Sequence, residues 1–345
     1  MIPISPATIS HQAELDMQTK LDKLAKPIAG LGNLESLAVK LAGIQQTIDI
    51  KVSKRCCLLF SADHGVVEEE VSATPKQVTA LQSINSVDRT TTIGVLTKLF
   101  NCDLKVTDVG VDYDFNDPRI IDRKIAYGTK NMVHESAMTR QQAELSIKIG
   151  MEIAEQAIEE GNDVLLIGEL GIANTSSASA IIAAALDVPA EKVVGRGSNI
   201  SDQRLIHKTE IVQKALADRK PAKDDALDIL SQVGGFEIGA MAGAIIAAAN
   251  AGVPIILDGF LTYSSCILAQ KFIPDIGKHV IASHASHELG TQIALKALNL
   301  EANYNLDLAV GEGSGAALLL PWLDAIDNLL KNMTTLKNLN VHFTK

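Results

Sequence analysis

Two glutamates of this sequence stand in glycine-rich turns, where a carboxylate can take part in chemistry. Glu312 lies in the run Gly311-Glu312-Gly313-Ser314-Gly315-Ala316, and Glu169 lies in the run Gly168-Glu169-Leu170-Gly171. Glycines let a backbone approach a ligand closely, and the N-terminus of a following helix favours an anion. Glu312 is therefore either a solvated carboxylate that caps its own helix or a proton acceptor in a narrow, partly dry cleft.

The same run around Glu312 fits the pattern G-x-G-x-x-A, which dinucleotide-binding proteins place at the start of a βαβ unit. Such a site needs a further βαβ unit and an acidic residue about 20 residues later. Too few residues follow Ala316, and most of them have a helical pattern. The sequence therefore gives little support to a nucleotide-dependent oxidoreductase.

Three other polar clusters have more than one interpretation. The run from His284 to Glu288 has two histidines and an acid that could bind a metal, but it matches neither H-E-x-x-H nor H-x-x-E-H. We therefore favour a loop that shapes a cleft, with Ser286 able to donate to a phosphate. No G-x-S-x-G serine accompanies Asp63-His64-Gly65, and whether Asp63 or His64 takes part in chemistry stays open. The polar residues from Asn174 onward either hold a phosphate or form an ordinary helix cap, with Asn174 or Thr175 as N-cap.

The elements that must position these turns alternate along the chain. Six short apolar runs have the length of strands buried on both faces: Cys56–Phe60, Leu104–Val109, Val164–Ile167, Pro254–Leu257, Val280–Ala282 and Leu306–Val310. Helical patterns cover 8–25, 34–47, 75–99, 139–160, 174–186, 236–250, 261–271 and 314–331. We expect a small hairpin within the irregular segment 112–135. The alternation predicts an α/β fold, a Rossmann-like, mostly parallel sheet with helices on both faces.

Polar or glycine-rich turns follow all six predicted strands. They begin at Ser61, Asp108, Gly168, Asp258, Ser283 and Gly311. Because ligands of an open parallel sheet bind outside the carboxyl ends of the strands, we expect these turns to meet at one edge. The sequence therefore predicts one cleft that contains both glutamates.

The composition limits the class of protein. The 345 residues include 31 Lys and Arg against 41 Asp and Glu, a net charge of −10, which argues against nucleic-acid binding. Hydrophobic residues make up 47% and aromatic residues 3%, so aliphatic side chains must form the core. The four cysteines lack C-x-x-C spacing and no signal-peptide pattern is present, so we expect buried thiols in a cytoplasmic protein. The apolar run 239–257 is interrupted by Asn250, Gly252 and Pro254, which predicts a buried helix and strand and no membrane span.

Taken together, these turns resemble one family, the nicotinate-nucleotide–dimethylbenzimidazole phosphoribosyltransferases. The similar segments occur in the family's order over nearly the whole chain: Lys26-Pro27 with Gly30-Leu31-Gly32-Asn33-Leu34-Glu35, Ala62-Asp63-His64-Gly65-Val66, Pro75-Lys76 with Val78-Thr79, Gly168-Glu169-Leu170-Gly171 with Asn174-Thr175, Gly234-Gly235-Phe236-Glu237, Leu257-Asp258-Gly259-Phe260, Ser283-His284 and Gly311-Glu312-Gly313-Ser314-Gly315-Ala316-Ala317. One such segment is weak support, whereas seven or more in register are strong support.

The resemblance implies a domain organisation and an activity. Family members combine a large Rossmann-like catalytic domain, here 51–314, with a small helical domain from both chain ends, here 1–50 with 315–345. They are homodimers in which the partner's small domain helps to close each site. They transfer phosphoribose from nicotinate mononucleotide to an aromatic base such as 5,6-dimethylbenzimidazole, giving an α-ribotide and nicotinate for cobamide nucleotide-loop assembly. This scheme requires no metal or other cofactor.

The resemblance also implies roles for single residues. Glu312 corresponds to the family's general base, and Glu169 corresponds to its second acid. The phosphate contacts correspond to Gly171, Lys208 and Ser286, and the pocket for the base includes the positions of Thr74 and Gln82. The matching motifs add Leu170, Asn174, Asp258, Gly311 and Gly313 to the predicted substrate-binding residues.

One residue departs from the family pattern. Where Thr74 stands we expect Ser in the benzimidazole enzymes, and the added methyl group narrows the pocket for the base. A related branch uses phenol or p-cresol and works as a heterodimer of two paralogous subunits. The sequence therefore leaves the acceptor and the partner open, whereas the presence of both Glu169 and Glu312 argues against a non-catalytic paralogue.

Overall fold

The computed structural model describes residues 2–339, and these contain a six-stranded sheet in which every strand pair is parallel. In spatial order the strands are β3 (Ile120–Asp122), β2 (Asp103–Gly110), β1 (Arg55–Ala62), β4 (Val164–Leu170), β5 (Ile255–Leu257) and β6 (Val280–Ala282). The chain runs outward from β1 to β3, returns to β4 beside β1, and then runs outward to β6. The predicted Rossmann-like parallel sheet is confirmed.

The side chains of β1 show why this strand lies in the middle of the sheet. All eight of its residues are buried. Cys56, Leu58 and Phe60 belong to the core on one face, whereas Cys57 and Leu59 belong to the core on the other. A strand that alternates in this way needs helices on both sides, because apolar side chains leave both faces of the sheet.

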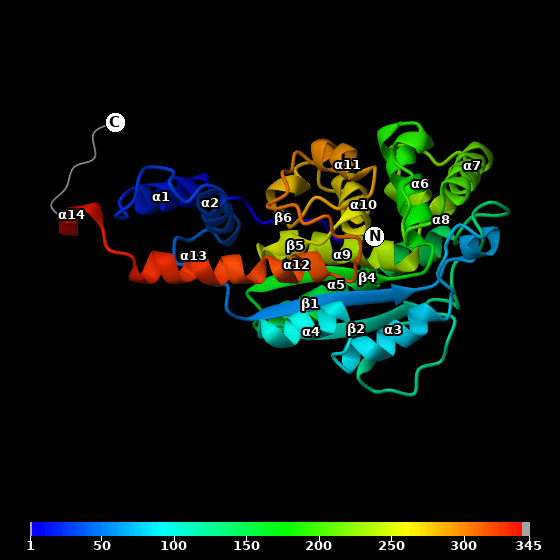
Figure 1. Cartoon of the computed structure of the whole chain (residues 1–345), viewed down its shortest axis with the longest axis horizontal. Helices are drawn as coiled ribbons and strands as arrows, with labels where there is room; N and C mark the ends of the chain where they lie inside the picture. The colour runs from blue at the N-terminus through cyan, green and yellow to red at the C-terminus, as the bar shows by residue number, and fades with distance from the viewer. Residues whose placement is uncertain (1, 340–345) are drawn as a thin grey trace.

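Two layers of helices cover the sheet (Figure 1). One core contains side chains of α5 (Arg140–Glu159), α6 (Asn174–Leu186), α7 (Asp202–Arg219), α8 (Ala226–Val233), α9 (Phe236–Ala251), α10 (Phe260–Gln270) and α11 (Thr291–Ala297). The opposite core contains side chains of α3 (Val78–Val87), α4 (Thr92–Leu99) and α12 (Ser314–Leu318). Figure 1 shows α3 and α4 on one side of β1, and α10 and α11 on the other.

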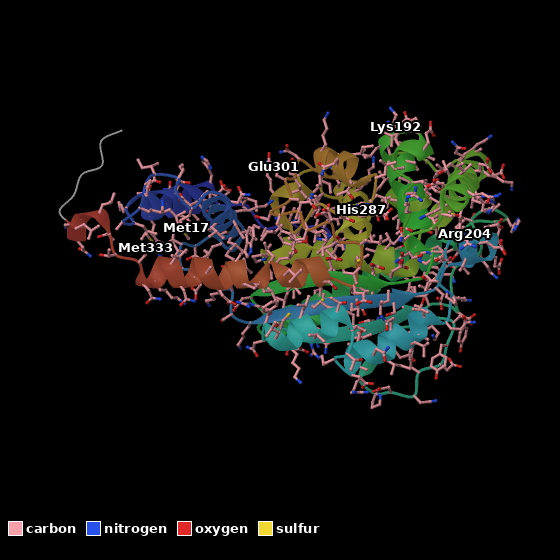
Figure 2. All side chains as sticks on the ribbon, in the orientation of Figure 1. Met17, Lys192, Arg204, His287, Glu301 and Met333 are labelled. Carbon is pink, nitrogen blue, oxygen red and sulfur yellow. The ribbon has the colours of Figure 1, made fainter. Side chains whose placement is uncertain are left out.

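Helices from the first and last parts of the chain meet at one end of the molecule. There α1 (His11–Asp22), α2 (Asn33–Gln45), α13 (Leu320–Asn332) and α14 (Leu336–Leu339) lie together (Figure 1), and Figure 2 places Met17 of α1 and Met333 after α13 in this region. The amide of Ala25 donates to the carbonyl of Thr334 at 2.8 Å, which ties the ends to each other. The domain boundaries at residues 50 and 315 stay a prediction.

Three of the sequence-based element assignments need correction. Residues 306–310 form no strand, and Leu306 and Val310 are 59% and 44% exposed. The described sheet ends at β6, and this segment instead meets the loop after β6, where the His287 amide donates to the Leu308 carbonyl at 3.2 Å. Segment 112–135 contains the single strand β3, which pairs parallel to β2, so it is not a hairpin. The helical pattern 75–99 is two helices, since the chain turns at Arg89 with φ 58° and restarts at the N-cap Thr91.

The structure also contains helices that the sequence did not reveal. They are α7, α8, α11 and the short α14. In α7 only four of 18 residues are buried, so its apolar stripe is too thin to read from periodicity. Ser201, whose side chain accepts from the amide of Arg204 at 3.3 Å, is the N-cap signal that could have located its start.

The long apolar run and the cysteines lie where the sequence places them. Residues 239–257 form the buried part of α9, a turn and β5. Across the described residues, no helix has both the length and the apolar character that a membrane crossing needs. All four cysteines are free thiols and buried, as expected.

Candidate active site

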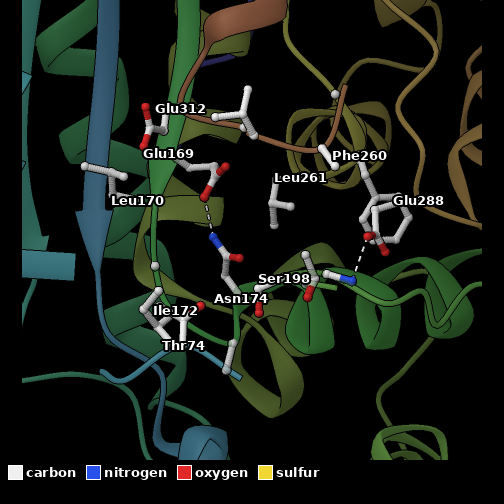
Figure 3. Close-up of a pocket in the computed structure, with 18 of the residues that line it drawn as sticks. Thr74, Glu169, Leu170, Ile172, Asn174, Ser198, Phe260, Leu261, Glu288 and Glu312 are labelled. Carbon is white, nitrogen blue, oxygen red and sulfur yellow. Dashed lines mark hydrogen bonds between the residues drawn. The ribbon is translucent and has the colours of Figure 1, made fainter. Parts of the chain in front are cut away.

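A cavity of about 280 Å³ opens at the carboxyl end of the sheet, next to the place where the strand order reverses between β1 and β4. Its walls come from the ends of β4 and β5, the loop after β6, the first turns of α6, and the segment before α3. Figure 3 shows Glu169 and Glu312 on one side of this space and Glu288 on the other. The topology thus brings the ends of several distant strands to one site.

The turn that carries Glu312 has an uncommon backbone. Gly311, Glu312 and Gly313 have successive φ values of 70°, 64° and 86°. A side chain in this region costs about 1–3 kcal/mol, so the surrounding structure must hold Glu312 there. The turn also lies directly against β4, because a Cβ atom on Gly168 would come within 2.7 Å of the Gly313 nitrogen. The close packing of the turn against β4 thus holds Glu312 in this unfavourable conformation.

Asp258 accepts hydrogen bonds from the backbone of this turn. It follows β5, and its two carboxylate oxygens each accept one backbone N–H at 3.1 Å, from Gly313 and from Ala316. Burial raises the pKa of Asp258 to about 7, although the backbone donors oppose that rise. Asp258 lines the cavity, but its visible partners are the first turn of α12, so it anchors the segment that presents Glu312.

Glu312 points one carboxylate oxygen at a partner and leaves the other free. Gln82 of α3 donates to Glu312 Oε1 at 3.3 Å, whereas Oε2 is buried without a hydrogen-bond partner. The residue is only 8% exposed, and this burial raises its pKa. Because Glu312 also lines the cavity, its carboxylate, with a raised pKa, can accept a proton from a molecule there.

Glu169 is the last but one residue of β4 and lies beside the same turn. A Cβ atom on Gly311 would approach Glu169 Oε1 within 2.7 Å. Asn174 donates its side-chain amide to Glu169 Oε2, the contact drawn in Figure 3. Burial raises the pKa of Glu169 well above its usual value, and the charges of Glu237 and Asp258 raise it further.

Asn174 therefore has a different role from the predicted N-cap. The N-cap position of α6 is Ala173, which has a φ of 74° and no side-chain capping bond. The side chain of Asn174, the first residue of the helix, instead donates to Glu169. Thr175, the other predicted N-cap, accepts a hydrogen bond from Lys208 Nζ at 2.8 Å.

The far end of the cavity carries positive charge. Lys208 of α7 is 1% exposed, and burial lowers its pKa to about 8. Its ammonium group also donates to the Gly195 carbonyl at 3.0 Å, and Arg196 and Ser286 line the cavity as well. An ammonium, a guanidinium and a hydroxyl are donors that suit a phosphate group. Glu288 balances part of this charge and accepts from the Gly197 amide at 2.8 Å.

Comparison with known proteins agrees with this geometry. The family model described as phosphoribosyltransferase matches residues 7–341. The nicotinate-nucleotide–dimethylbenzimidazole phosphoribosyltransferase of Clostridioides difficile is 40% identical over 322 residues, 93% of this chain and 92% of the relative. The chain belongs to this family. By that membership it is a phosphoribosyltransferase.

Other members are similar over equally long stretches. The protein of that name from Citrifermentans bemidjiense is 39% identical, over 94% of this chain and 93% of the relative. A crystal structure of the phosphoribosyltransferase of that kind from Thermus thermophilus superposes with a TM-score of 0.91 at 36% identity, over 97% of this chain and 100% of that chain. Both the sequence and the three-dimensional arrangement thus support membership of the family.

The structure brings together eleven of the twelve residues that the sequence and the family resemblance point to. They all line the cavity: Thr74, Gln82, Glu169, Leu170, Gly171, Asn174, Lys208, Asp258, Ser286, Gly311 and Glu312. Gly313 does not line it, and its amide donates to Asp258. Their roles toward a substrate stay predictions.

The cavity also contains residues that sequence reasoning missed. Arg196, Ser198, Phe260, Leu261 and Glu288 line its wall. Arg196 and Ser198 come from a segment without a recognisable pattern, and only the two glycines at 195 and 197 hint at a turn. Phe260 and Leu261 belong to the first turn of a buried helix, so their sequence looks like core.

His284 and His64, the two histidines that the sequence singled out, lie in different places relative to the cavity. His284 lines the cavity, burial lowers its pKa to about 4, and its ring stacks on Tyr304 at 5.9 Å. This agrees with the prediction of a loop that shapes the cleft. Among the described residues, no His, Cys, Asp and Glu side chains form a group that could hold a metal ion. His64 is buried behind the cavity wall rather than in it.

Proposed function

We propose that this chain transfers the phosphoribosyl group of nicotinate mononucleotide to 5,6-dimethylbenzimidazole or a similar aromatic base. The products are nicotinate and an α-ribotide for the nucleotide loop of a cobamide. One observation carries the proposal: two buried carboxylates, Glu169 and Glu312, share a cavity whose far end carries the buried ammonium group of Lys208. The names of the relatives supply the substrates.

The phosphate of nicotinate mononucleotide fits the end of the cavity with Lys208, Arg196 and Ser286. The first turn of α6 adds backbone donors near Gly171, and helix N-termini favour anions. This places the ribose near the end of β4, with Glu169 beside it. Holding both reactants in line can lower the barrier by about 7–11 kcal/mol relative to free encounter.

The reaction then breaks one bond and forms another at the anomeric carbon. The C1′–N bond of the pyridinium breaks, and its electron pair returns to the ring nitrogen, so nicotinate leaves without an added proton. Positive charge grows on the ribose carbon, and the carboxylate of Glu169 stabilises it. The acceptor nitrogen attacks from the opposite face, which inverts the β configuration to α.

The acceptor must lose a proton when it forms the new bond. In a benzimidazole this proton leaves the second ring nitrogen, and the carboxylate of Glu312, which lines the cavity, is the group suited to take it. Gln82 supports Oε1, so that the carboxylate keeps its orientation. The raised pKa of Glu312 favours this transfer, because a stronger base accepts the proton more readily.

A phenolic acceptor is the second candidate, and the observation in its favour is Thr74. Thr74 lines the same cavity as Gln82, and its methyl group takes space that a bicyclic base would use. In this variant the phenol O–H donates its proton to Glu312, and the enzyme is the active subunit of a heterodimer instead of a homodimer. The remainder of the chemistry is unchanged.

One experiment separates these possibilities. The purified chain is mixed with nicotinate mononucleotide and either dimethylbenzimidazole or phenol, and release of nicotinate is followed. Release with the base alone supports the benzimidazole reaction, and faster release with phenol supports the second candidate. If nicotinate is released only after a paralogous protein is added, the result points to the heterodimer. If no combination releases nicotinate, the proposal is rejected.

A further inference from the structure

His284, in the loop after β6, lies in the wall of the cavity with its ring held in one orientation. The residue is only 4% exposed. Its imidazole stacks on the ring of Tyr304, with the centroids 5.9 Å apart and an angle of 20° between the planes. One edge of the ring packs against α12, because a Cβ atom on Gly315 would come within 2.1 Å of His284 Nδ1. These contacts fix the direction in which each ring nitrogen points.

The hydrogen bonds of Ser283 determine which nitrogen of His284 carries the proton. The hydroxyl of Ser283 donates to the carbonyl of Asp258 at 2.7 Å, and a hydroxyl has a single hydrogen to donate. In the 3.1 Å contact between this hydroxyl and His284 Nδ1, the donor is therefore Nδ1–H. Burial lowers the pKa of His284 to about 4, so the ring is neutral at pH 7 and Nε2 carries a lone pair.

Nε2 of His284 is left open beside the cavity. Within residues 2–339 no hydrogen bond reaches it, and it is not fully covered by other atoms. Gly259 lies next to it without a side chain, and a Cβ atom there would be 3.3 Å from both Nε2 and the Cβ atom of Ser286. Gly259, His284 and Ser286 all line the cavity. The wall therefore presents a hydrogen-bond acceptor next to the end that suits a phosphate.

Nicotinate mononucleotide has few groups that can donate to such an acceptor. Its phosphate, with a second pKa of about 6, is mostly a dianion above neutral pH and has only acceptor oxygens there. Its carboxylate also has only acceptor oxygens, and its ring nitrogen carries the ribose instead of a hydrogen. The donors that remain are the two hydroxyl groups of the ribose.

We propose that His284 is a specificity-determining residue of this site, and that its Nε2 accepts a hydrogen bond from one ribose hydroxyl of nicotinate mononucleotide. The inference rests on the proposed function, which places the phosphate near Ser286 and the anomeric carbon beside Glu169. A hydroxyl that donates to Nε2 holds the sugar between these two ends. A sugar that lacks this hydroxyl leaves Nε2 without a partner, so the site selects ribose over the corresponding deoxyribose.

His284→Asn tests the role of Nε2 alone. The amide of Asn keeps an N–H close to the place of Nδ1, where it can donate to Ser283, but Asn has no atom at the place of Nε2. The wild type and the variant are assayed with nicotinate mononucleotide and with its 2′-deoxy and 3′-deoxy analogues, using the acceptor that the wild type prefers. Release of nicotinate gives kcat/KM for each substrate.

The decisive quantity is the preference for ribose, the ratio of kcat/KM for nicotinate mononucleotide to that for each deoxy analogue. Comparing this ratio between the two enzymes cancels the intrinsic reactivity of each sugar. For one analogue the ratio should be roughly threefold to tenfold smaller in His284→Asn, the size of one neutral hydrogen bond, and for the other it should be unchanged. Unchanged ratios for both analogues, or an equal decrease for both, would overturn the inference. His279→Asn is the matched control, because His279 is 5% exposed but does not line the cavity, and its ratios should equal those of the wild type.

Nitrogen NMR of labelled histidine in the wild type keeps the test independent of how well the variant folds. At pH 7 it should show His284 protonated at Nδ1 and unprotonated at Nε2. Nicotinate mononucleotide should shift the Nε2 resonance, whereas the analogue without the donating hydroxyl should not. A proton on Nε2 refutes the inference, including the doubly protonated ring that the carboxylate of Asp258, 3.9 Å from Nδ1, would favour. If the wild type released no nicotinate, the proposed function would fall, while this measurement would still decide which nitrogen carries the proton.

Discussion

Replacing Glu312 by Gln tests the proposed general base with the smallest change of shape. Gln has the same length, keeps an oxygen for the donor Gln82, and lacks only the ability to take a proton. Asp258 binds the backbone of the turn, and Gly311 and Gly313 take positive φ values without steric cost, so the turn does not depend on the side chain at 312. The variant should therefore fold with an unchanged melting temperature.

The loss of turnover should be large and confined to the chemical step. Loss of general base catalysis lowers kcat by roughly 10²-fold or more, which corresponds to a barrier increase of about 2.7 kcal/mol for a factor of one hundred. The KM for nicotinate mononucleotide should change little, because the phosphate end of the cavity is formed by Lys208 and Ser286. Steady-state release of nicotinate measures both quantities.

The acidity of the acceptor provides the control. A phenol that is already ionised at the assay pH has no proton to give, so Glu312→Gln should lose much less activity with it than with a neutral acceptor. A kcat near that of the wild type in a folded variant would refute the assignment. An equal loss with ionised and neutral acceptors would also refute it, because the carboxylate would then act on something other than the acceptor proton.

Three further predictions follow from other residues of the site. Thr74→Ser removes a methyl group from the wall and should raise kcat/KM for dimethylbenzimidazole relative to phenol by about tenfold, measured in competition. Burial lowers the pKa of Lys208 to about 8, so its positive charge is lost above that pH. The KM of the wild type for nicotinate mononucleotide should therefore increase at pH values above about 8, whereas the KM of Lys208→Met should be high at every pH. The pKa of Asp258, about 7, is higher than in the unfolded chain, so the native state holds an extra proton between about pH 4 and 7. Asp258 should therefore make the folded state less stable as pH increases through this interval. Thermal unfolding across this interval should show a smaller decrease in Asp258→Asn, and an unchanged slope would contradict the raised pKa.

Local signals in the sequence were sufficient to predict a parallel sheet that is buried on both faces. Runs such as Cys56–Phe60 and Val164–Ile167 are short, apolar throughout and flanked by helical patterns, and only a parallel sheet buried on both faces accommodates that alternation. The turns after these runs then had to meet at the carboxyl edge. Both predictions follow from short apolar runs and from the direction of the strands, and neither requires a known contact between distant side chains.

The position of Glu312 was predicted for a reason that proved wrong. The run Leu306–Val310 was interpreted as a strand that delivers the turn to the sheet edge, but it is an irregular segment whose second half lines the cavity. The turn reaches the edge because Gly168 leaves room for it and Asp258 binds its amides. Both facts depend on residues far away in sequence, and no local pattern reports them.

The sequence by itself determined the class of fold, the strand–helix alternation and the two acidic turns, because these follow from hydrophobic periodicity and from backbone chemistry within a few residues. Only the tertiary structure decided what each polar side chain faces. It directed Asn174 to Glu169 instead of a helix cap, brought Arg196 and Glu288 into the cavity, and paired His64 with Glu237. Hydrogen bonds and charge compensation join residues from separate elements, so their partners are fixed only when the chain is packed.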